Sequence, residues 1–362
     1  MDDRRFDSIN MKKLCLVLPS LSGGGMERVM TELAWFFVTK ENIEIHLILL
    51  SRCAKFYTMP PEVIIHEPEF EFNNKLRLYN TFRTIYYLRR EVKLIRPDTV
   101  LSFGEMYNSF VLLSTLLLKI RIIVSDRSKP DKKWGLFHDS LRKFLYIKAT
   151  GIISQTNYSK DFLESVTKHQ NIIVIPNPVM PFKQLNEEKQ NIILNVGRLI
   201  GTKRIDLLLD IFANSKFEDW KLWIVGDGPE RKNLEKKSFD LDIQNYVTFW
   251  GNKKDIEVFY SKARIFAFTS NSEGFPNALL EAMSAGLACI SFDCIAGPSD
   301  LINNGENGYL IKNGDVKDYL IKLNSLINSP ELIEQFSKSS VISTKEFEIN
   351  KIGNKYFNYL FL

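Results

Sequence analysis

Cysteine and histidine are scarce in this chain. It contains four cysteines, none spaced as Cys-x-x-Cys, and four scattered histidines without the spacing of zinc ligands. We therefore expect the cysteines to be small buried hydrophobic residues in a reducing compartment. Asp240-Leu241-Asp242 has the spacing of a metal-binding Asp-x-Asp motif, but aspartates in a connection are more often solvated turn residues. Neither a metal nor another cofactor is expected. The cysteines are Cys15, Cys53, Cys289 and Cys294, and the histidines are His46, His66, His138 and His169.

Long apolar runs are also absent. The longest, residues 110–118, is much shorter than the roughly 20 residues that span a bilayer. The first ten residues are polar, and the apolar run at 14–18 is too short for the core of a secretory signal. We expect a cytoplasmic protein that is soluble or attached to the inner face of the cell membrane.

The net charge of the chain is small and positive. It is +5, with a sequence pI near 8.8. An excess of this size is compatible with anionic ligands or a membrane surface. It does not favour nucleic-acid binding, because the sequence contains no recognised nucleic-acid-binding module.

Hydrophobic residues make up 45% of the chain, and short apolar runs alternate with stretches of helical periodicity. A chain of 362 residues suits two domains. The alternation predicts βαβ units with parallel sheets, which is an α/β fold. In the first half, strands are expected at 14–18, 43–50, 99–103 and 122–125, and helices at 27–38 and 76–95.

The motif Ile175-Pro176-Asn177-Pro178 divides the chain, because proline continues neither a helix nor a central strand. We therefore expect two Rossmann-like domains, 1–177 and 178–345. The aromatic-rich tail, 346–362, is expected to form a helix that returns to the first domain. In the second domain, strands are expected at 192–196, 223–225, 247–250, 265–268 and 288–292, and helices at 206–212, 230–237 and 277–285.

A glycine-rich loop, Ser22-Gly23-Gly24-Gly25-Met26-Glu27-Arg28, follows the first expected strand. Glycines at a strand-to-helix turn let backbone amides approach a phosphate. Arg28 stands where a dinucleotide fingerprint has its third glycine, and Ser51 stands where it has an acid. Hydride transfer is therefore disfavoured, and a merely tight turn is the alternative to a phosphate-binding loop.

Two cations follow the first strand of the second domain, in Asn195-Val196-Gly197-Arg198-Leu199-Ile200-Gly201-Thr202-Lys203-Arg204. The planar guanidinium of Arg198 can grip a phosphate, and Lys203 can add a point charge. This pair would neutralise a diphosphate leaving group without a metal. The alternative is a solvated loop with surface cations.

The segment Ser272-Glu273-Gly274-Phe275-Pro276-Asn277-Ala278-Leu279-Leu280-Glu281 is the most informative. Pro276 suits the first turn of a helix, whose free amides at about 274–278 can donate to sugar hydroxyls or phosphate oxygens. Glu273 in the loop and Glu281 in the helix can hydrogen-bond different hydroxyl groups of one ligand. A helix-dipole role or an exposed position explains either glutamate alone. It does not explain the Gly-Phe-Pro loop between them.

In this order, the motifs resemble the retaining glycosyltransferases of family 4. These enzymes have the GT-B fold, in which two Rossmann-like domains face each other across a cleft. The resemblance covers essentially the whole chain and is strongest from 192 to 311. It rests on Gly23–Gly25, Gly197-Arg198 with Lys203, Gly226-Asp227-Gly228-Pro229, Glu273-x7-Glu281 and Ile295-Ala296-Gly297-Pro298.

The resemblance implies roles for individual residues. Arg198 and Lys203 would bind the donor diphosphate, and Glu273 would contact sugar hydroxyls, which makes these three the implied catalytic residues. Glu281 would hold the ribose. The first domain would close over the diphosphate and accept the second substrate, with retention at the anomeric carbon by attack on the face that the diphosphate leaves. The other implied donor contacts are Gly24, Gly25, Gly197, Gly226, Gly228, Trp250, Gly274, Phe275, Pro276 and Asn277.

One departure from the family concerns the strand expected at 122–125. Many relatives place a histidine after it, whereas this chain reads Ser125-Asp126-Arg127-Ser128. Asp126 or Arg127 is expected at the donor sugar or acceptor instead. No catalytic base is assigned, because the leaving phosphate can take the acceptor proton in a same-face mechanism.

A basic amphipathic segment runs from Lys75 to Arg96, and further cations lie at 129–143. A helix of this kind can lie on anionic lipid. The alternative is a helix with one core face and one solvated basic face. This basic surface is the reason to expect a lipid-linked acceptor, such as a polyprenyl-diphosphate oligosaccharide.

The predicted function is transfer of a sugar from a nucleotide sugar, expected to be a UDP-sugar, to a saccharide acceptor in bacterial surface-polysaccharide or glycan assembly. One alternative is a nucleotide-sugar epimerase of similar fold. Another is a non-catalytic subunit that binds sugar nucleotides. The intact set of Arg198, Lys203, Glu273 and Glu281 argues against this last alternative.

Overall fold

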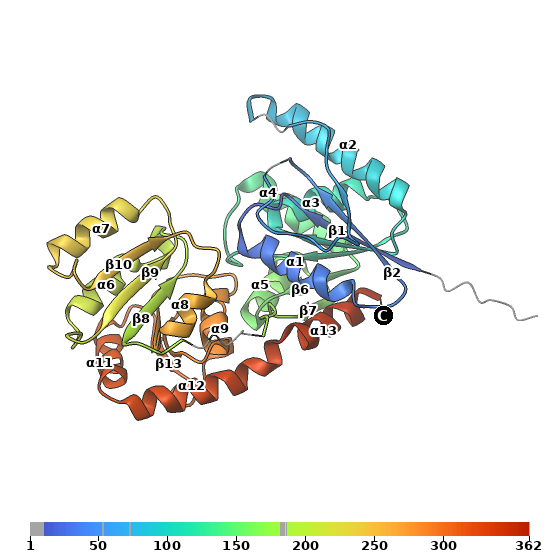
Figure 1. Ribbon diagram of the computed structural model, residues 1–362. Helices are drawn as coiled ribbons and strands as arrows, with labels where there is room; N and C mark the ends of the chain where they lie inside the picture. Colours follow the sequence, from blue (N-terminus) through green and yellow to red (C-terminus); the bar gives the residue numbers. More distant parts are fainter. Residues whose placement is uncertain (1–10, 53, 72–73, 182–184, 186, 362) are drawn as a thin grey trace, which may run out of the picture. The chain divides into compact units, whose positions relative to one another are not determined.

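The computed structural model describes residues 11–52, 54–71, 74–181, 185 and 187–361, and contains two α/β units (Figure 1). Unit 1 is Met1–Pro178 with Ile349–Leu362, and unit 2 is Val179–Glu348. The chain therefore leaves unit 1 at the Pro-Asn-Pro motif and returns to it at the last helix.

A parallel sheet of seven strands forms the centre of unit 1, in the order β3-β2-β1-β4-β5-β6-β7. The chain runs outward from β1 in one direction and from β4 in the other, so the loops that follow β1 and β4 leave the sheet side by side. The strands are β1 (Lys12–Leu18), β2 (Ile43–Leu49), β3 (Ile64–His66), β4 (Thr99–Phe103), β5 (Arg121–Ser125), β6 (Gly151–Ser154) and β7 (Ile172–Val174).

Helices cover both faces of this sheet and bury an apolar core on each. One core includes side chains of α1 and α13, and the other includes side chains of α2 and α3. Gly353 allows α13 to lie directly against α1, since a β-carbon there would stand 2.5 Å from the Phe36 ring. The helices are α1 (Gly25–Phe37), α2 (Arg77–Ile95), α3 (Glu105–Ser114), α4 (Leu136–Leu145), α5 (Asn157–Thr167) and α13 (Ile349–Phe361).

Unit 2 repeats the plan with six parallel strands, in the order β10-β9-β8-β11-β12-β13. Here the order reverses between β8 and β11, which are hydrogen-bonded neighbours. The strands are β8 (Ile192–Val196), β9 (Lys221–Val225), β10 (Val247–Gly251), β11 (Ile265–Phe268), β12 (Ala288–Asp293) and β13 (Tyr309–Lys312).

The helices of unit 2 also cover both faces of their sheet. Ser329 caps α12 by accepting a hydrogen bond from the Leu332 amide at 3.3 Å, and Pro330 occupies the first helical position. The helices are α6 (Ile205–Ala213), α7 (Arg231–Asp240), α8 (Glu257–Lys262), α9 (Asn277–Ser284), α10 (Pro298–Leu301), α11 (Val316–Ile327) and α12 (Pro330–Thr344).

The predicted α/β class with parallel sheets is confirmed. The bounds of each predicted strand differ from those of an observed strand by at most two residues. Four strands were not predicted, because runs of three or four residues carry little periodicity; they are β3, β6, β7 and β13. Cys15, Cys289 and Cys294 are buried free thiols, and Cys53 lies outside the described residues. Among the helices that the structure describes, none has the length and apolarity needed to cross a bilayer.

Candidate active site

The predicted catalytic residues of unit 2 lie on two loops that leave neighbouring strands. Arg198 and Lys203 follow β8, and Glu273 follows β11. Because β8 and β11 are parallel and adjacent, both loops emerge at the carboxyl edge of the sheet, at the point where the strand order reverses. Open α/β sheets bind their ligands at this kind of position.

Lys203 and Glu273 form an ion pair at this point. The Lys203 Nζ lies 2.6 Å from the Glu273 Oε1, and their side chains are only 21% and 12% exposed. The two loops are joined further by backbone, since the Asn271 amide donates to the Thr202 carbonyl at 3.0 Å and the Thr269 hydroxyl donates to the Lys203 carbonyl at 3.1 Å. A fixed cation therefore lies beside a fixed carboxylate.

Three glycines let the loops after β8 and β9 approach closely. A β-carbon on Gly226 would stand 1.9 Å from the Gly197 carbonyl oxygen, and one on Gly228 would stand 2.3 Å from the Leu199 carbonyl oxygen. Gly226 also has φ +137°, a conformation that L side chains rarely adopt. Arg198, on the same loop as Gly197, is exposed to solvent. Its guanidinium is therefore accessible to an anionic ligand.

The loop Ile295-Ala296-Gly297-Pro298 supports the segment that begins at Glu273. The Glu273 amide donates to the Ile295 carbonyl at 3.3 Å. Gly297 packs against Pro276 so closely that a β-carbon would stand 2.2 Å from the proline ring. The two motifs, distant in the sequence, thus form one structural element.

The helix α9 begins immediately after Pro276 and carries Glu281. The Glu281 Oε2 accepts a hydrogen bond from the Tyr260 hydroxyl at 3.0 Å, and Tyr260 is buried in α8. Phe275 is 6% exposed and belongs to the apolar core beneath α9, and the Asn277 amide donates to the Phe275 carbonyl. Phe275 therefore anchors the loop, while Gly274 remains partly exposed.

Trp250, at the end of β10, lies in an aromatic cluster. Its ring centroid is 5.1 Å from that of Trp223 and 5.2 Å from that of Phe259. The next residue, Gly251, pairs with Gly226, whose amide donates to the Gly251 carbonyl at 2.9 Å. The end of β10 is therefore tied to the glycine loop after β9.

In unit 1, the glycine loop lies at the corresponding point of its own sheet. Gly24 is the N-cap of α1, and its amide donates to the Ser22 carbonyl. A β-carbon on Gly104, which follows β4, would stand 3.2 Å from the Met26 sulfur. The first turn of α1 and the loop after β4 thus lie close together at the reversal of strand order, and Gly25 is exposed there.

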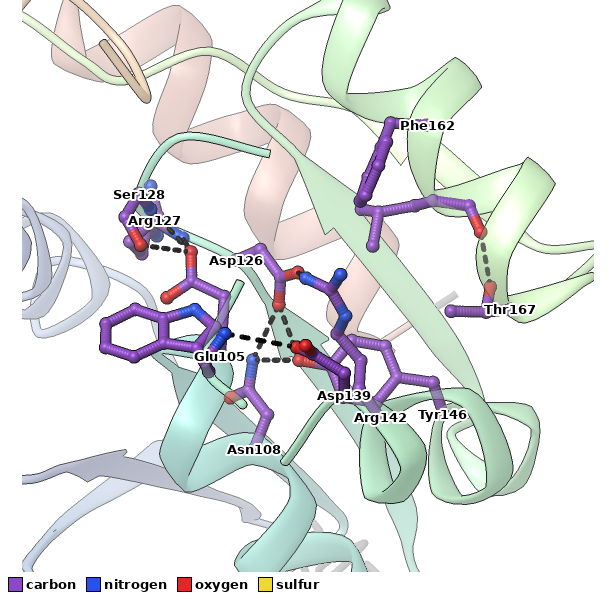
Figure 2. A network of polar contacts seen from close by, with 12 residues as sticks. Glu105, Asn108, Asp126, Arg127, Ser128, Asp139, Arg142, Tyr146, Phe162 and Thr167 are labelled. Atoms are coloured by element: carbon purple, nitrogen blue, oxygen red, sulfur yellow. Dashed lines mark hydrogen bonds and ion pairs between the residues drawn. The ribbon is translucent and has the colours of Figure 1, made fainter. Parts of the chain in front are cut away.

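Asp126, at the carboxyl end of β5, is 3% exposed and held in a polar network (Figure 2). Its Oδ1 accepts hydrogen bonds from the Tyr146 hydroxyl at 2.5 Å and the Asn108 amide at 3.2 Å. The Arg142 guanidinium lies 3.5 Å from its Oδ2. Burial raises the pKa of Asp126 to about 7, and the charge of Glu105 adds to the rise. The carboxyl faces the interior of unit 1.

Arg127 also turns inward. Its guanidinium donates to the Asn177 side chain at 2.6 Å and the Tyr356 hydroxyl at 2.8 Å, and lies 3.4 Å from the centre of the Phe103 ring. Its backbone amide donates to Glu105. Arg127 therefore connects the loop after β5 to the Pro-Asn-Pro motif and to α13. The sequence predicted that Asp126 or Arg127 contacts the donor sugar or the acceptor. In this structure both side chains make hydrogen bonds or ion pairs within unit 1.

The structure thus brings Lys203 and Glu273 into contact and places Glu281 on the adjoining helix. Sequence reasoning missed the partners that hold these groups, chiefly Tyr260 in unit 2 and Asn108 with Tyr146 in unit 1. No local motif marks them, since their partners lie 18 to 38 residues away. Within the described residues, no group of three or more histidine, cysteine, aspartate or glutamate side chains is arranged to hold a metal ion.

Comparison with known proteins agrees with this architecture. Residues 23–181 match the family described as Glycosyltransferase Family 4, and residues 177–340 match Glycosyl transferases group 1. The chain is 30% identical to the amylovoran biosynthesis glycosyltransferase AmsD of Erwinia amylovora, over 97% of this chain and 100% of the relative.

Two further similarities extend over nearly the whole chain. It is 26% identical to a Campylobacter jejuni enzyme named as an α-1,4-N-acetyl-D-galactosaminyltransferase acting on a GalNAc-GalNAc-diNAcBac-PP-undecaprenol, over 97% of this chain and 98% of the relative. The structure of Anabaena HepE in complex with UDP superposes with a TM-score of 0.81 at 16% identity, over 97% of this chain and 99% of that chain.

Two parallel-sheet units of this topology, together with the likeness to the HepE structure, define the GT-B fold. The chain belongs to glycosyltransferase family 4. It is a glycosyltransferase whose bacterial relatives include enzymes of polysaccharide and lipopolysaccharide biosynthesis.

Proposed function

We propose that this enzyme transfers a sugar from a UDP-sugar to a saccharide carried on a polyprenyl diphosphate, with retention of the anomeric configuration. The observation that carries the proposal is the Lys203–Glu273 pair at the strand reversal of unit 2. A cation there suits the diphosphate, and the neighbouring carboxylate suits the sugar hydroxyls. Glu281 on α9 is the proposed ribose ligand.

The proposed chemistry needs no metal. The bond between the anomeric carbon and the diphosphate oxygen breaks, and its electron pair leaves with the diphosphate. Arg198 and Lys203 stabilise the charge that develops there. The acceptor hydroxyl forms the new bond on the same face, and its proton passes to the departing phosphate oxygen. Glu273 orients the sugar.

The names of relatives support the choice of substrates. UDP is bound in the HepE structure, and the Campylobacter relative is named for an undecaprenyl-diphosphate acceptor. We therefore place the reaction at the cytoplasmic face of the cell membrane, where such an acceptor and a cytosolic nucleotide sugar meet. Transfer is favoured over epimerisation because the matched relatives are named transferases.

The stereochemistry of the product tests the proposal. A panel of UDP-α-sugars is first ranked by thermal stabilisation, and the best donor is then incubated with a polyprenyl-diphosphate saccharide. The new linkage is expected to be α by NMR, and the yield is expected to persist in EDTA. A β-linked product would refute retention, an epimerised free donor would indicate the epimerase, and loss of activity in EDTA would refute metal independence.

Tyr260 is predicted to position Glu281 for the nucleotide. Tyr260→Phe removes the hydroxyl that donates to Glu281 and should weaken UDP binding about three- to tenfold, the effect of one buried hydrogen bond. The maximal rate at saturating donor should change less than about twofold. Calorimetric titration with UDP measures the first effect, and Tyr246→Phe, another tyrosine of unit 2, is the matched control. Unchanged UDP affinity would show that Glu281 does not depend on Tyr260.

A further inference from the structure

Two helices of unit 1 present large apolar side chains to solvent. Leu78 of α2 is 78% exposed and Leu136 of α4 is 90% exposed, so these are not partly covered core residues. We call these side chains, together with those of the segments that flank the two helices, the α2–α4 surface. Its apolar members are Leu76, Leu78, Tyr79, Phe82, Tyr86, Leu136, Phe137, Phe144 and Ile147, all exposed, and it includes the exposed lysines Lys132, Lys133, Lys143 and Lys148.

The exposed side chains follow helical spacing. Tyr79, Phe82 and Tyr86 lie on one side of α2, while Tyr87, Leu88 and Val92 on its other side are buried in the core. Phe137 and Phe144 are seven residues apart on α4 and share one face. A surface helix normally turns charged and polar residues outward. Both helices instead have an outward apolar face.

The two helices lie in one layer. The helix α3 packs against both, and α2, α3 and α4 lie close together in unit 1 (Figure 1). Burial lowers the pKa of His138 in α4, and the positive charge of Arg77, in the first turn of α2, adds to the lowering, in keeping with neighbouring helix starts. Both helices start at the carboxyl edge of the sheet, because each follows a connection from the end of a parallel strand.

The positive charge around this surface indicates the chemistry of its partner. Segments 75–96 and 129–148 contain thirteen lysines and arginines against three acidic residues, a net charge of +10. The whole chain carries +5, so the remainder is net negative. A second copy docking on the same surface would bring two positively charged surfaces together, which disfavours a symmetric dimer. An anionic partner with an apolar interior satisfies both properties of the surface.

We propose that the α2–α4 surface binds the interface of an anionic lipid bilayer. Its lysines contact lipid headgroups, and its aromatic and aliphatic side chains enter the boundary between headgroups and acyl chains. The carboxyl edge of the unit 1 sheet is then held near the membrane, where the lipid-linked acceptor is found. The proposal deepens the proposed function by naming the surface that meets the acceptor's membrane, although lipid binding itself requires no acceptor.

Vesicle sedimentation with the full chain tests the proposal. The wild type should bind vesicles that contain phosphatidylglycerol, bind phosphatidylcholine vesicles much less, and dissociate as salt screens the lysines. Phe137→Ser/Phe144→Ser and Lys133→Gln/Lys143→Gln should each weaken binding about fivefold or more. The matched controls lie on α7 of unit 2 and should bind like the wild type; they are Phe239→Ser and Lys232→Gln/Lys236→Gln, at exposed positions.

Different results would contradict lipid binding by the α2–α4 surface and the proposed function. The proposal is wrong if Phe137→Ser/Phe144→Ser and Lys133→Gln/Lys143→Gln bind vesicles as well as the wild type. It is also wrong if the wild type forms a salt-stable dimer that Phe137→Ser/Phe144→Ser dissociates. If the enzyme binds vesicles as expected but transfers sugar to no lipid-linked saccharide, the proposed acceptor is wrong, while lipid binding by the α2–α4 surface is supported. With a short water-soluble acceptor, the surface variants should retain wild-type transfer rates, and a loss there would mean that they damage the enzyme itself.

Discussion

Replacing Glu273 or Lys203 by alanine is expected to lower kcat/KM at least about tenfold, and up to a thousandfold, in the transfer assay. The two side chains make a 2.6 Å ion pair and are mostly shielded from water. In the proposed mechanism, Lys203 stabilises the departing diphosphate, and Glu273 orients the sugar that it leaves. Removing either one also deprives the other of its partner, so both functions weaken together.

The double variant Lys203→Ala/Glu273→Ala tests whether the two side chains act as a pair or independently. If the pair acts as a unit, the double variant should lose little activity beyond the worse single variant. The matched control is another ion pair of unit 2, Lys262 with Glu187, whose charged atoms are 3.5 Å apart. Alanine at either of these positions should leave kcat/KM within about twofold of wild type, because a surface pair contributes little.

Folded variants of Lys203 or Glu273 with normal transfer rates would refute the assignment of the site. Folding is checked by hydrogen exchange of the amides in β8 and β11, which flank the pair. Fully multiplicative losses in the double variant would mean that the ion pair seen in the free enzyme has no part in the reaction.

The strands and helices that the sequence predicted are encoded locally. The predicted helix ranges did not include α3, α4, α5, α8, α10, α11 and α12. Strands such as β4 and β8 combine β-branched residues with flanking turns, and both were predicted with their observed bounds. The loop-borne residues of the predicted site came from the resemblance to family 4. Gly226 and Gly297 are required by close contacts, with the Gly197 carbonyl and the Pro276 ring, and such positions leave a visible mark in the sequence.

What the sequence did not predict is set by contacts between distant segments. Asp126 follows a strand at the edge where ligands bind, and a contact of Asp126 or Arg127 with the donor sugar or acceptor was predicted there. Its burial depends on Tyr146 and Asn108, which reach it from a separate short helix and from α3. The helix α4 (Leu136–Leu145) was not predicted, so its outward apolar face was missed as well.

The buried carboxyl of Asp126 should make the stability of unit 1 depend on pH. Burial and the charge of Glu105 raise its pKa from 3.8 to about 7, so the folded protein binds a proton more tightly than the unfolded chain does. Between these two pKa values, raising the pH therefore lowers the free energy of unfolding. The stabilising contribution is complete below about pH 4 and is lost by about pH 7.

The variant Asp126→Asn removes this titration and keeps an oxygen that can accept from Tyr146 and Asn108. The difference in free energy of unfolding between this variant and the wild type should shift in favour of the variant by about 3 kcal/mol from pH 5 to pH 8. Other groups that titrate in unit 1, such as His46, whose pKa is lowered mainly by burial, are common to both proteins and cancel in the difference.

Hydrogen exchange of amides in β4, β5 and β6 measures this difference, because it reports on unit 1 without requiring both units to unfold together. The matched control is Asp139→Asn, a half-buried aspartate of α4 that accepts a hydrogen bond from the Trp134 amide. Its stability should follow the pH dependence of the wild type. Parallel pH profiles for Asp126→Asn and the wild type would show that Asp126 is charged throughout this range, and that Arg142, 3.5 Å away, outweighs the burial of the carboxylate.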